Sequence, residues 1–208
     1  MTSPIPAILP LAILEAVQNI DTPADDGLGA LEHELAAKRL GLSPTVAAQV
    51  KRYRERADDG DDVEREEALA VFRLVGRRPD ADLVFADAGR RAARYAAKER
   101  GGGARALAAV SPGKLATSMR MRTAGRLAQR WLQVELRSSQ GVPRAEAGGE
   151  SPALAAGDDG VGCRFYTAGL AELLRLVANY EGVMIHEACR TRGDARCIWR
   201  AERAQGYE

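Results

Sequence analysis

Three cysteines and one histidine near the C-terminal end place the strongest constraint on how this chain can fold. Cys163, Cys189 and Cys197 are the three cysteines of the 208-residue chain, and His186 lies among them in the pattern C-x22-H-x2-C-x7-C. Three thiolates and an imidazole form a full tetrahedral ligand set for Zn²⁺, and a closed nitrogen–sulfur shell of this kind is usually structural. The pattern therefore predicts a structural zinc site formed by these four residues.

Two alternatives remain open for these residues. Cysteines are often small buried hydrophobic residues that bind no metal, although an odd number of them argues against a disulfide framework. Glu187 is a competing oxygen ligand beside His186. Neighbouring residues of a strand point to opposite faces, so we expect one of the two to reach the metal. The segment VMIHEACRTRGDARCIWRAE itself predicts two strands joined by a turn at Gly193–Asp194.

The N-terminal half is expected to be helical. Ser43 is a typical N-cap, and Pro44 suits the first position of a helix. The acidic run 57–62 is expected to be a solvated loop, and the glycines at 101–103 to end a helix. We expect helices at 5–20, in two stretches within 28–57, at 63–75, at 80–99, and from Ser111–Pro112 to about residue 129.

The C-terminal half is expected to contain the strands. Trp131 opens an alternating, strand-like segment, and residues 138–160 are expected to be a loop or to carry a weak hairpin strand around 152–156. An amphipathic helix over 163–179 would place Cys163 at its N-terminus, where the helix dipole favours a thiolate. Two strands are expected at 182–188 and 196–202.

The net charge of +1 conceals a strongly basic centre. Residues 90–144 carry 13 basic and two acidic residues, whereas residues 1–89 carry 10 basic and 17 acidic ones. Such a block can bind an anionic partner, nucleic acid or a ligand with carboxylates. It can equally be a solvated helix face that docks on the acidic first half. Aromatic residues are nearly absent from the block, so nucleic acid is not an expected partner.

Motifs of catalysis and of membrane insertion are missing. The sequence has no dinucleotide, Walker, nucleophile-elbow or HExxH motif, and His33 is expected to be a surface residue. No run reaches the roughly 20 apolar residues that span a membrane. The apolar N-terminus lacks the basic region and cleavage motif of a signal peptide. We expect this segment to dock as a helix, and the protein to be cytoplasmic.

The C-terminal third resembles the 4-vinyl reductase domain family in the segment CRFYTAGLAELLRLVANYEGVMIHEACRTRGDARCIWRAE. That family shows a cysteine that opens a helix, then a strand, an acidic residue, and two cysteines around a Gly-Asp turn. Zinc-containing members use three cysteines and one glutamate. Their cysteines fall on Cys163, Cys189 and Cys197, and their glutamate falls on His186, a departure that leaves tetrahedral zinc chemistry intact. The segment LVFADAGRRAARYAAKER resembles the helix before the core in stand-alone members, so the resemblance covers about residues 75–203.

The resemblance implies a mixed α/β fold of the α+β type, related to subunits of the transport-particle tethering complex. A small antiparallel sheet would pack against several helices, with an apolar ligand pocket between them. It divides the chain into a helical N-terminal extension, 1–75, and a ligand-binding domain with the zinc site, 76–208. Family members are sensors of aromatic compounds or accessory proteins of bacteriochlorophyll synthesis in photosynthesis, and the stand-alone build is similar to the second branch.

These observations lead to three hypotheses about function. The first is a carrier of a hydrophobic small molecule, a tetrapyrrole intermediate of bacteriochlorophyll synthesis, with pigment-synthesis enzymes and a second copy of the chain as further candidate partners. The second is a tetrapyrrole vinyl reductase, although no nicotinamide or flavin motif supports it and we expect no redox activity of the chain alone. The third is a regulatory module that docks an anionic partner. For the first hypothesis we expect an apolar ligand surface and carboxylate-binding arginines, formed by Tyr95, Trp131, Phe165, Tyr166, Arg90, Arg91, Arg94, Arg126 and Arg130.

Overall fold

A computed structural model describes residues 3–22, 40–98, 113–139, 141–156 and 160–203. In this part of the chain, six α-helices pack with two antiparallel sheets, which is the α+β class expected from the sequence, with a helical N-terminal half. The helices are α1 (Ile8–Asp21), α3 (Pro44–Asp58), α4 (Arg65–Gly76), α5 (Ala81–Lys98), α7 (Gly113–Leu127) and α8 (Val161–Leu173). Helices α7 and α8 continue into the π-helical turns η2 (Ala128–Leu132) and η4 (Leu174–Ala178).

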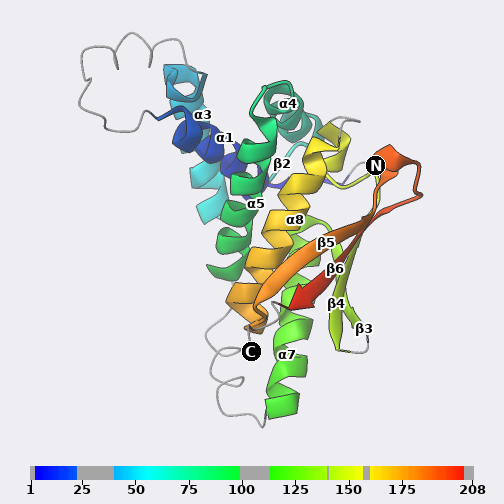
Figure 1. Cartoon of the computed structure of the whole chain (residues 1–208). Coiled ribbons are helices and arrows are strands. Elements are labelled where there is room, and N and C mark those ends of the chain that lie inside the picture. Colours follow the sequence, from blue (N-terminus) through cyan, green and yellow to red (C-terminus); the bar gives the residue numbers. More distant parts are fainter. Residues whose placement is uncertain (1–2, 23–39, 99–112, 140, 157–159, 204–208) are drawn as a thin grey trace, which may run out of the picture.

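The larger sheet has four antiparallel strands in the order β3–β4–β6–β5. Its strands are β3 (Glu135–Ser139), β4 (Val142–Ala147), β5 (Gly182–Ala188) and β6 (Cys197–Arg203). The smaller sheet pairs β1 (Ile5–Pro6) with β2 (Asp62–Val63). Short 3-10 turns lie at η1 (Leu40–Leu42), η3 (Leu154–Ala156) and η5 (Arg190–Arg192). Figure 1 shows α8 packed between the larger sheet and α5, with α1 on the other side of α5.

Helices α5 and α8 touch through their backbones, because two glycines face each other at the contact. A Cβ atom placed on Gly89 would lie 2.1 Å from the carbonyl oxygen of Phe165, and one on Gly169 would lie 3.0 Å from the carbonyl oxygen of Gly89. Around this contact, Phe72 packs edge-on against Phe85 and against Phe165, with ring centroids 6.0 Å apart in both pairs. The close approach fixes the position of α8, whose first turn carries Cys163.

A single hydrophobic core includes residues of both the expected N-terminal extension, 1–75, and the expected ligand-binding domain, 76–208. Leu11 of α1, Phe85 of α5 and Trp199 of β6 all belong to it and are buried. The division at residue 75 stays a prediction. Among the described residues, no helix is both long and apolar enough to cross a membrane.

Several helices were predicted correctly, with changes at their ends. Ser43 caps α3 as expected, since its hydroxyl accepts a hydrogen bond of 3.2 Å from the N–H of Val46. The helix predicted from residue 5 begins at Ile8, because the two residues before Ala7 pair with β2 instead. The same pairing takes up Val63, so α4 begins two residues later than predicted. The expected loop 57–62 is shorter, because α3 extends to Asp58 and β2 begins at Asp62.

The middle of the chain differs more. The strand predicted from Trp131 is wrong, because the chain stays helical to Leu132 and turns at Gln133, whose φ is 53°. The strand β3 follows at residues 135–139 and forms a hairpin with β4, which ends at Ala147, before the weak strand expected at 152–156. A 3-10 turn occupies that position instead. Alanine and proline in VPRAEA have low strand propensity, so pairing rather than local preference forms β4.

The C-terminal elements agree closely with the sequence-based expectations. Helix α8 with its π-helical turn covers residues 161–178, β5 covers the predicted 182–188, and β6 lies one residue later than predicted. Four expectations fall outside the described residues: the helical stretch at 28–39, the surface position of His33, the glycines at 101–103, and the helix start at Ser111–Pro112.

Candidate metal centre

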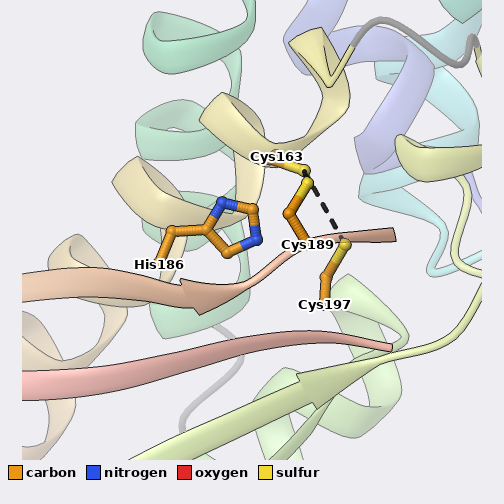
Figure 2. Close-up of side chains that lie close together, drawn as sticks. All are labelled: Cys163, His186, Cys189 and Cys197. Carbon is orange, nitrogen blue, oxygen red and sulfur yellow. Dashed lines mark hydrogen bonds between the residues drawn. The ribbon is translucent and has the colours of Figure 1, made fainter. Parts of the chain in front are cut away.

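Three elements that meet beside the N-terminus of α8 bring the four predicted ligands together (Figure 2). Cys163 lies in the first turn of α8, His186 lies near the end of β5, Cys189 follows β5, and Cys197 opens β6. Strands β5 and β6 pair antiparallel, with His186 opposite Trp199. The turn between the strands therefore brings Cys189 back beside Cys197, under the start of the helix.

The spacing of the sulfur atoms fits tetrahedral coordination. Sγ of Cys163 lies 3.8 Å from Sγ of Cys189 and 3.8 Å from Sγ of Cys197. The ligand atoms of the three cysteines and His186 all lie within 4.8 Å of one another. Zn–S bonds of about 2.3 Å at tetrahedral angles place two sulfurs roughly 3.8 Å apart. The three cysteines are free and buried, and with His186 they form a cluster that could hold a metal ion.

The imidazole of His186 is prepared to act as a neutral ligand. Its Nε2 atom is buried and has no hydrogen-bond partner in the described structure. Burial, followed by the positive charge of Arg192, lowers the pKa of His186 below its ordinary value of 6.5. The ring is therefore neutral at pH 7, and it stacks on the indole of Trp199 with centroids 4.7 Å apart. A buried ring nitrogen without a hydrogen-bond partner is costly in a protein, and a metal ion bound at Nε2 would compensate this cost.

Glu187, the competing ligand, points to the other face of the sheet. Its carboxylate accepts a hydrogen bond of 2.5 Å from Nε of Arg200 and lies 4.0 Å from a guanidinium nitrogen of Arg144. These arginines belong to the neighbouring strands β6 and β4. Neighbouring residues of β5 point to opposite faces of the sheet. Of the two candidates for the fourth ligand, His186 therefore lies at the cluster, and Glu187 lies in a surface ion-pair network.

The turn after β5 holds Cys189 and Cys197 in place through its backbone. The N–H of Cys189 donates a hydrogen bond of 2.7 Å to Oδ2 of Asp194. The N–H of Arg190 points at Sγ of Cys197, 3.5 Å away. Gly193 closes the turn with a φ of 94°, a conformation that favours glycine. The predicted Gly193–Asp194 turn is thus present, and it contributes directly to the arrangement of the ligands.

The three thiols have different acidities in the absence of a metal ion. Burial raises the pKa of Cys163 and of Cys197, and neighbouring cysteines add to the effect at Cys163. At Cys189 burial acts in the same direction, but hydrogen bonds from the hydroxyl and backbone of Thr191 outweigh it and lower the pKa. At Cys163, burial thus opposes the effect of the helix N-terminus, which was expected to favour a thiolate. A coordinated metal would reverse this, because it deprotonates its thiol ligands.

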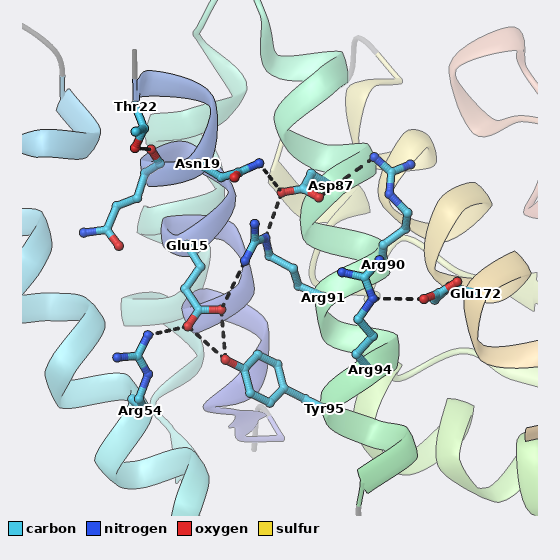
Figure 3. A network of polar contacts seen from close by, with 11 residues as sticks. Glu15, Asn19, Thr22, Arg54, Asp87, Arg90, Arg91, Arg94, Tyr95 and Glu172 are labelled. Carbon is cyan, nitrogen blue, oxygen red and sulfur yellow. Dashed lines mark hydrogen bonds and ion pairs between the residues drawn. The ribbon is translucent and has the colours of Figure 1, made fainter. Parts of the chain in front are cut away.

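The residues of α5 that were predicted to contact a ligand make ion pairs and hydrogen bonds within the chain (Figure 3). The hydroxyl of Tyr95 lies 2.9 Å from both carboxylate oxygens of Glu15. Nε of Arg91 donates to Asp87 at 2.7 Å, and Nε of Arg94 donates to Glu172 at 2.9 Å. Arg91 also lies 3.9 Å from the carboxylate of Glu15 on α1, which is a contact with the acidic first half of the kind that the docking alternative expected. Arg90 lies 3.9 Å from Asp87 on its own helix.

The other predicted ligand-binding residues lie in three different environments. The side chains of Phe165 and Tyr166 are fully buried in the core, with ring centroids 5.3 Å apart. Trp131 is buried, with the guanidinium of Arg130 over its ring at 5.1 Å. Arg126 and Arg130 line two different pockets. The role of these residues in ligand binding stays a prediction.

Sequence reasoning missed the residues that surround the ligands. Trp199 stacks on His186, Thr191 lies 3.0 Å from Sγ of Cys189, and Asp194 holds the backbone of the same cysteine. A signal was present for Trp199, because it lies two residues after Cys197 in a strand and so shares its face. The contribution of Thr191 depends on the turn conformation and has no comparable signal in the sequence.

Comparison of the chain with protein-family models, with curated proteins and with solved structures found no match in any of the three. The donor set, the distances between the sulfur atoms and the unpartnered imidazole nitrogen are the features that mark these four residues as a candidate metal centre.

Proposed function

We propose that the chain is a small-molecule binding protein in which a structural zinc ion holds the four-stranded sheet and helix α8 together. The observation that carries the proposal is the cluster of Cys163, His186, Cys189 and Cys197, with sulfur atoms 3.8 Å apart and an unpartnered Nε2 atom. Soft sulfur and imidazole donors in tetrahedral spacing favour zinc.

A structural role follows from the number of protein ligands. Four protein ligands leave no coordination position for water or substrate. A pocket of about 250 Å³ borders the cluster at Cys163 and Cys197, but a fully ligated ion does not offer it a reactive site. The ion when bound would join the start of α8 to β5 and β6, so its binding energy would contribute to folding.

The proposed ligand is a flat hydrophobic molecule with carboxylates, and a tetrapyrrole intermediate of bacteriochlorophyll synthesis fits this description. Support comes from a pocket of about 860 Å³ between α7 and β3. Met121 and Leu136 supply apolar surface, while Arg122, Arg126 and Arg137 supply positive charge around it. Arginine suits carboxylates because its planar fork can bond both oxygens. Arg126 is one of the arginines that the sequence singled out for this role.

A titration of the zinc-loaded protein with a Mg-porphyrin diacid and with its dimethyl ester, followed by fluorescence quenching, tests the ligand class. We expect the diacid to bind at least about tenfold more tightly, because a charged hydrogen-bonded pair contributes about 1.5–3 kcal/mol. Arg126→Gln should remove most of this difference. Arg56→Gln, an exposed arginine on α3, is the matched control and should leave it unchanged.

Two outcomes would contradict parts of this proposal. Equal affinity for acid and ester would remove the arginines from the binding site. Binding of neither compound would contradict the tetrapyrrole ligand. Reduction of a divinyl tetrapyrrole by the purified protein with NADPH would instead support the vinyl reductase hypothesis.

A further inference from the structure

A polar pocket of about 550 Å³ lies where the small sheet, the π-helical turn η2 and the segment after β4 meet. It is distinct from the pocket between α7 and β3, although Gln129 of the π-helical turn lines both. Its lining is almost entirely polar: Ser3, Pro4, Asp62, Arg65, Gln129, Arg130, Gln133, Glu150 and Ser151. A volume of this size is in the range of small-molecule sites.

The carboxylate of Asp62 contributes an acceptor without a partner. Its Oδ1 atom is shielded from solvent and has no hydrogen bond in the described structure. Asp62 is fixed at this position because its backbone pairs with Pro6 in the small sheet. Buried carboxylate oxygens are nearly always hydrogen-bonded, since the loss of hydration is otherwise uncompensated. The unpartnered atom therefore indicates a donor group that the chain itself does not supply.

The guanidinium of Arg65 contributes donors that are only partly used. Its side chain is 11% exposed, so most of its charge is removed from water. One of its nitrogens donates a hydrogen bond of 2.6 Å to the carbonyl oxygen of Glu150. The carboxylate of Glu150 lies 3.8 Å away and is itself 99% exposed, so it compensates the charge weakly. Arginine carries five N–H donors, and an anion in the pocket would engage those left over.

The walls of the pocket are held by hydrogen bonds. Gln133 adopts a left-handed backbone conformation, with a φ of 53°, and its side-chain amide donates to the carbonyl oxygen of Pro4 at 3.0 Å. The buried Ser151 donates through its hydroxyl to the carbonyl oxygen of Gln133 at 3.2 Å. Arg130 adds a second guanidinium, held over the ring of Trp131. These contacts position the polar groups before any ligand arrives.

We propose that this pocket binds a small organic acid that also carries a hydroxyl or ammonium group. The acid would pair with Arg65 and Arg130, and the hydroxyl or ammonium would donate to the carboxylate of Asp62, which turns to meet it. The same groups disfavour other ligands. The two guanidinium groups repel a metal cation, an inorganic anion offers few donors to Asp62, and a neutral sugar leaves both arginine charges uncompensated.

Calorimetric titration of the full-length, zinc-loaded protein with three four-carbon acids tests the proposal. Succinate has the two carboxylates alone, L-malate adds a hydroxyl, and L-aspartate adds an ammonium group. We expect L-malate or L-aspartate to bind at least about tenfold more tightly than succinate, because the added group satisfies Asp62. The same affinity for all three acids, or binding of none of them at millimolar concentration, would overturn the proposal.

Two variants test which side chain of the pocket binds which group of the ligand. Asp62→Ala should reduce the affinity for L-malate and L-aspartate to that for succinate, and Arg65→Met should weaken all three acids by about tenfold or more. Arg56→Met, which changes an exposed arginine on α3 outside both pockets, is the matched control and should bind as the wild type does. If Arg65→Met does not fold, the affinities of the three acids for the wild type and for Asp62→Ala still test the proposal. Porphyrin binding involves the other pocket, so either proposal can fail without the other.

Discussion

The imidazole of His186 lies flat on the indole of Trp199, with ring centroids 4.7 Å apart and planes inclined by 11°. The indole N–H donates a hydrogen bond of 2.9 Å to Oγ1 of Thr167, and the Thr167 hydroxyl donates one of 2.9 Å to the carbonyl oxygen of Cys163. A chain of contacts thus connects two of the four proposed metal ligands through residues that do not themselves bind the metal. It orients the imidazole on one side and holds the first turn of α8 on the other.

This connection predicts an effect of the surrounding residues on zinc affinity. Thr167→Val should weaken zinc binding by about 10- to 100-fold, as the loss of groups that orient metal ligands typically does. Trp199→Phe keeps a stacking ring but loses the N–H, and should show a smaller effect in the same direction. Competition with a chromogenic chelator measures both. Thr123→Val removes a similar hydroxyl-to-carbonyl hydrogen bond in α7, at 3.0 Å to Met119, and should leave zinc affinity unchanged.

The opposite orientations of His186 and Glu187 predict different effects of two neighbouring substitutions. His186→Ala should lower zinc affinity by at least about tenfold, because one of four ligands is lost. Glu187→Ala should retain zinc like the wild type, since its carboxylate pairs with Arg200. Metal analysis of the purified variants checks this. Stoichiometric zinc in Cys189→Ala, or a wild-type protein without metal and with three titratable thiols, would contradict the metal centre itself.

Asp21 and Arg78 form a largely buried, two-point ion pair that should govern stability in acid. The guanidinium nitrogens of Arg78 lie 3.0 and 2.6 Å from the carboxylate oxygens of Asp21, which also accept from the N–H of Gly41 at 2.8 Å. Burial raises the pKa of Asp21, but the hydrogen bonds from Arg78 and Gly41 lower it by more than this. The pKa therefore lies below its ordinary value of 3.8. The pair therefore stabilises the fold fully above pH 3.8, and this contribution is lost as the pH falls through the lowered pKa.

Asp21→Asn should accordingly lower the free energy of unfolding at pH 7 by about 1.5–3 kcal/mol, because it removes one of the two carboxylates that bind Arg78, while the hydrogen bonds of 2.8 Å to Asp80 remain. The variant should also lose less stability than the wild type between pH 4 and pH 2. Urea unfolding at several pH values measures both effects. Asp82→Asn, which removes an exposed pair with Arg164, is the control and should cost less than about 1 kcal/mol.

The glycine contact between α5 and α8 predicts a large effect of a single methyl group. Gly89→Ala would place a Cβ atom 2.1 Å from the carbonyl oxygen of Phe165, so the helices must separate. We expect a loss of about 1–3 kcal/mol or more in the free energy of unfolding. Gly76→Ala adds a methyl group at the end of α4 with no atom within 4 Å, and should be neutral or stabilising. An equal effect of both substitutions would contradict the close contact.

The four residues of the candidate metal centre could be predicted from the sequence because the signals that place them are local. The helix start puts Cys163 in the first turn of α8, the Gly193–Asp194 turn brings Cys189 back toward Cys197, and strand alternation limits the choice to His186 or Glu187. Local preferences also predicted most helices and the strands β5 and β6. They failed at Trp131, because an alternating pattern of few residues does not distinguish a strand from the last turn of a buried helix.

The tertiary structure alone decided everything that depends on distant residues. Strand β4 forms because β3 and β6 pair with it on either side, although its own sequence has little strand preference. The contacts of Trp199 with His186 and Thr167 require β5, β6 and α8 to be packed together. The pocket at Asp62 and Arg65 exists because residues near the N-terminus pair with β2 and lie beside the π-helical turn. Residue types and their spacing thus determined which side chains could bind a metal, whereas long-range packing determined which polar groups remain without a partner, because burial and hydrogen bonding are properties of the assembled fold.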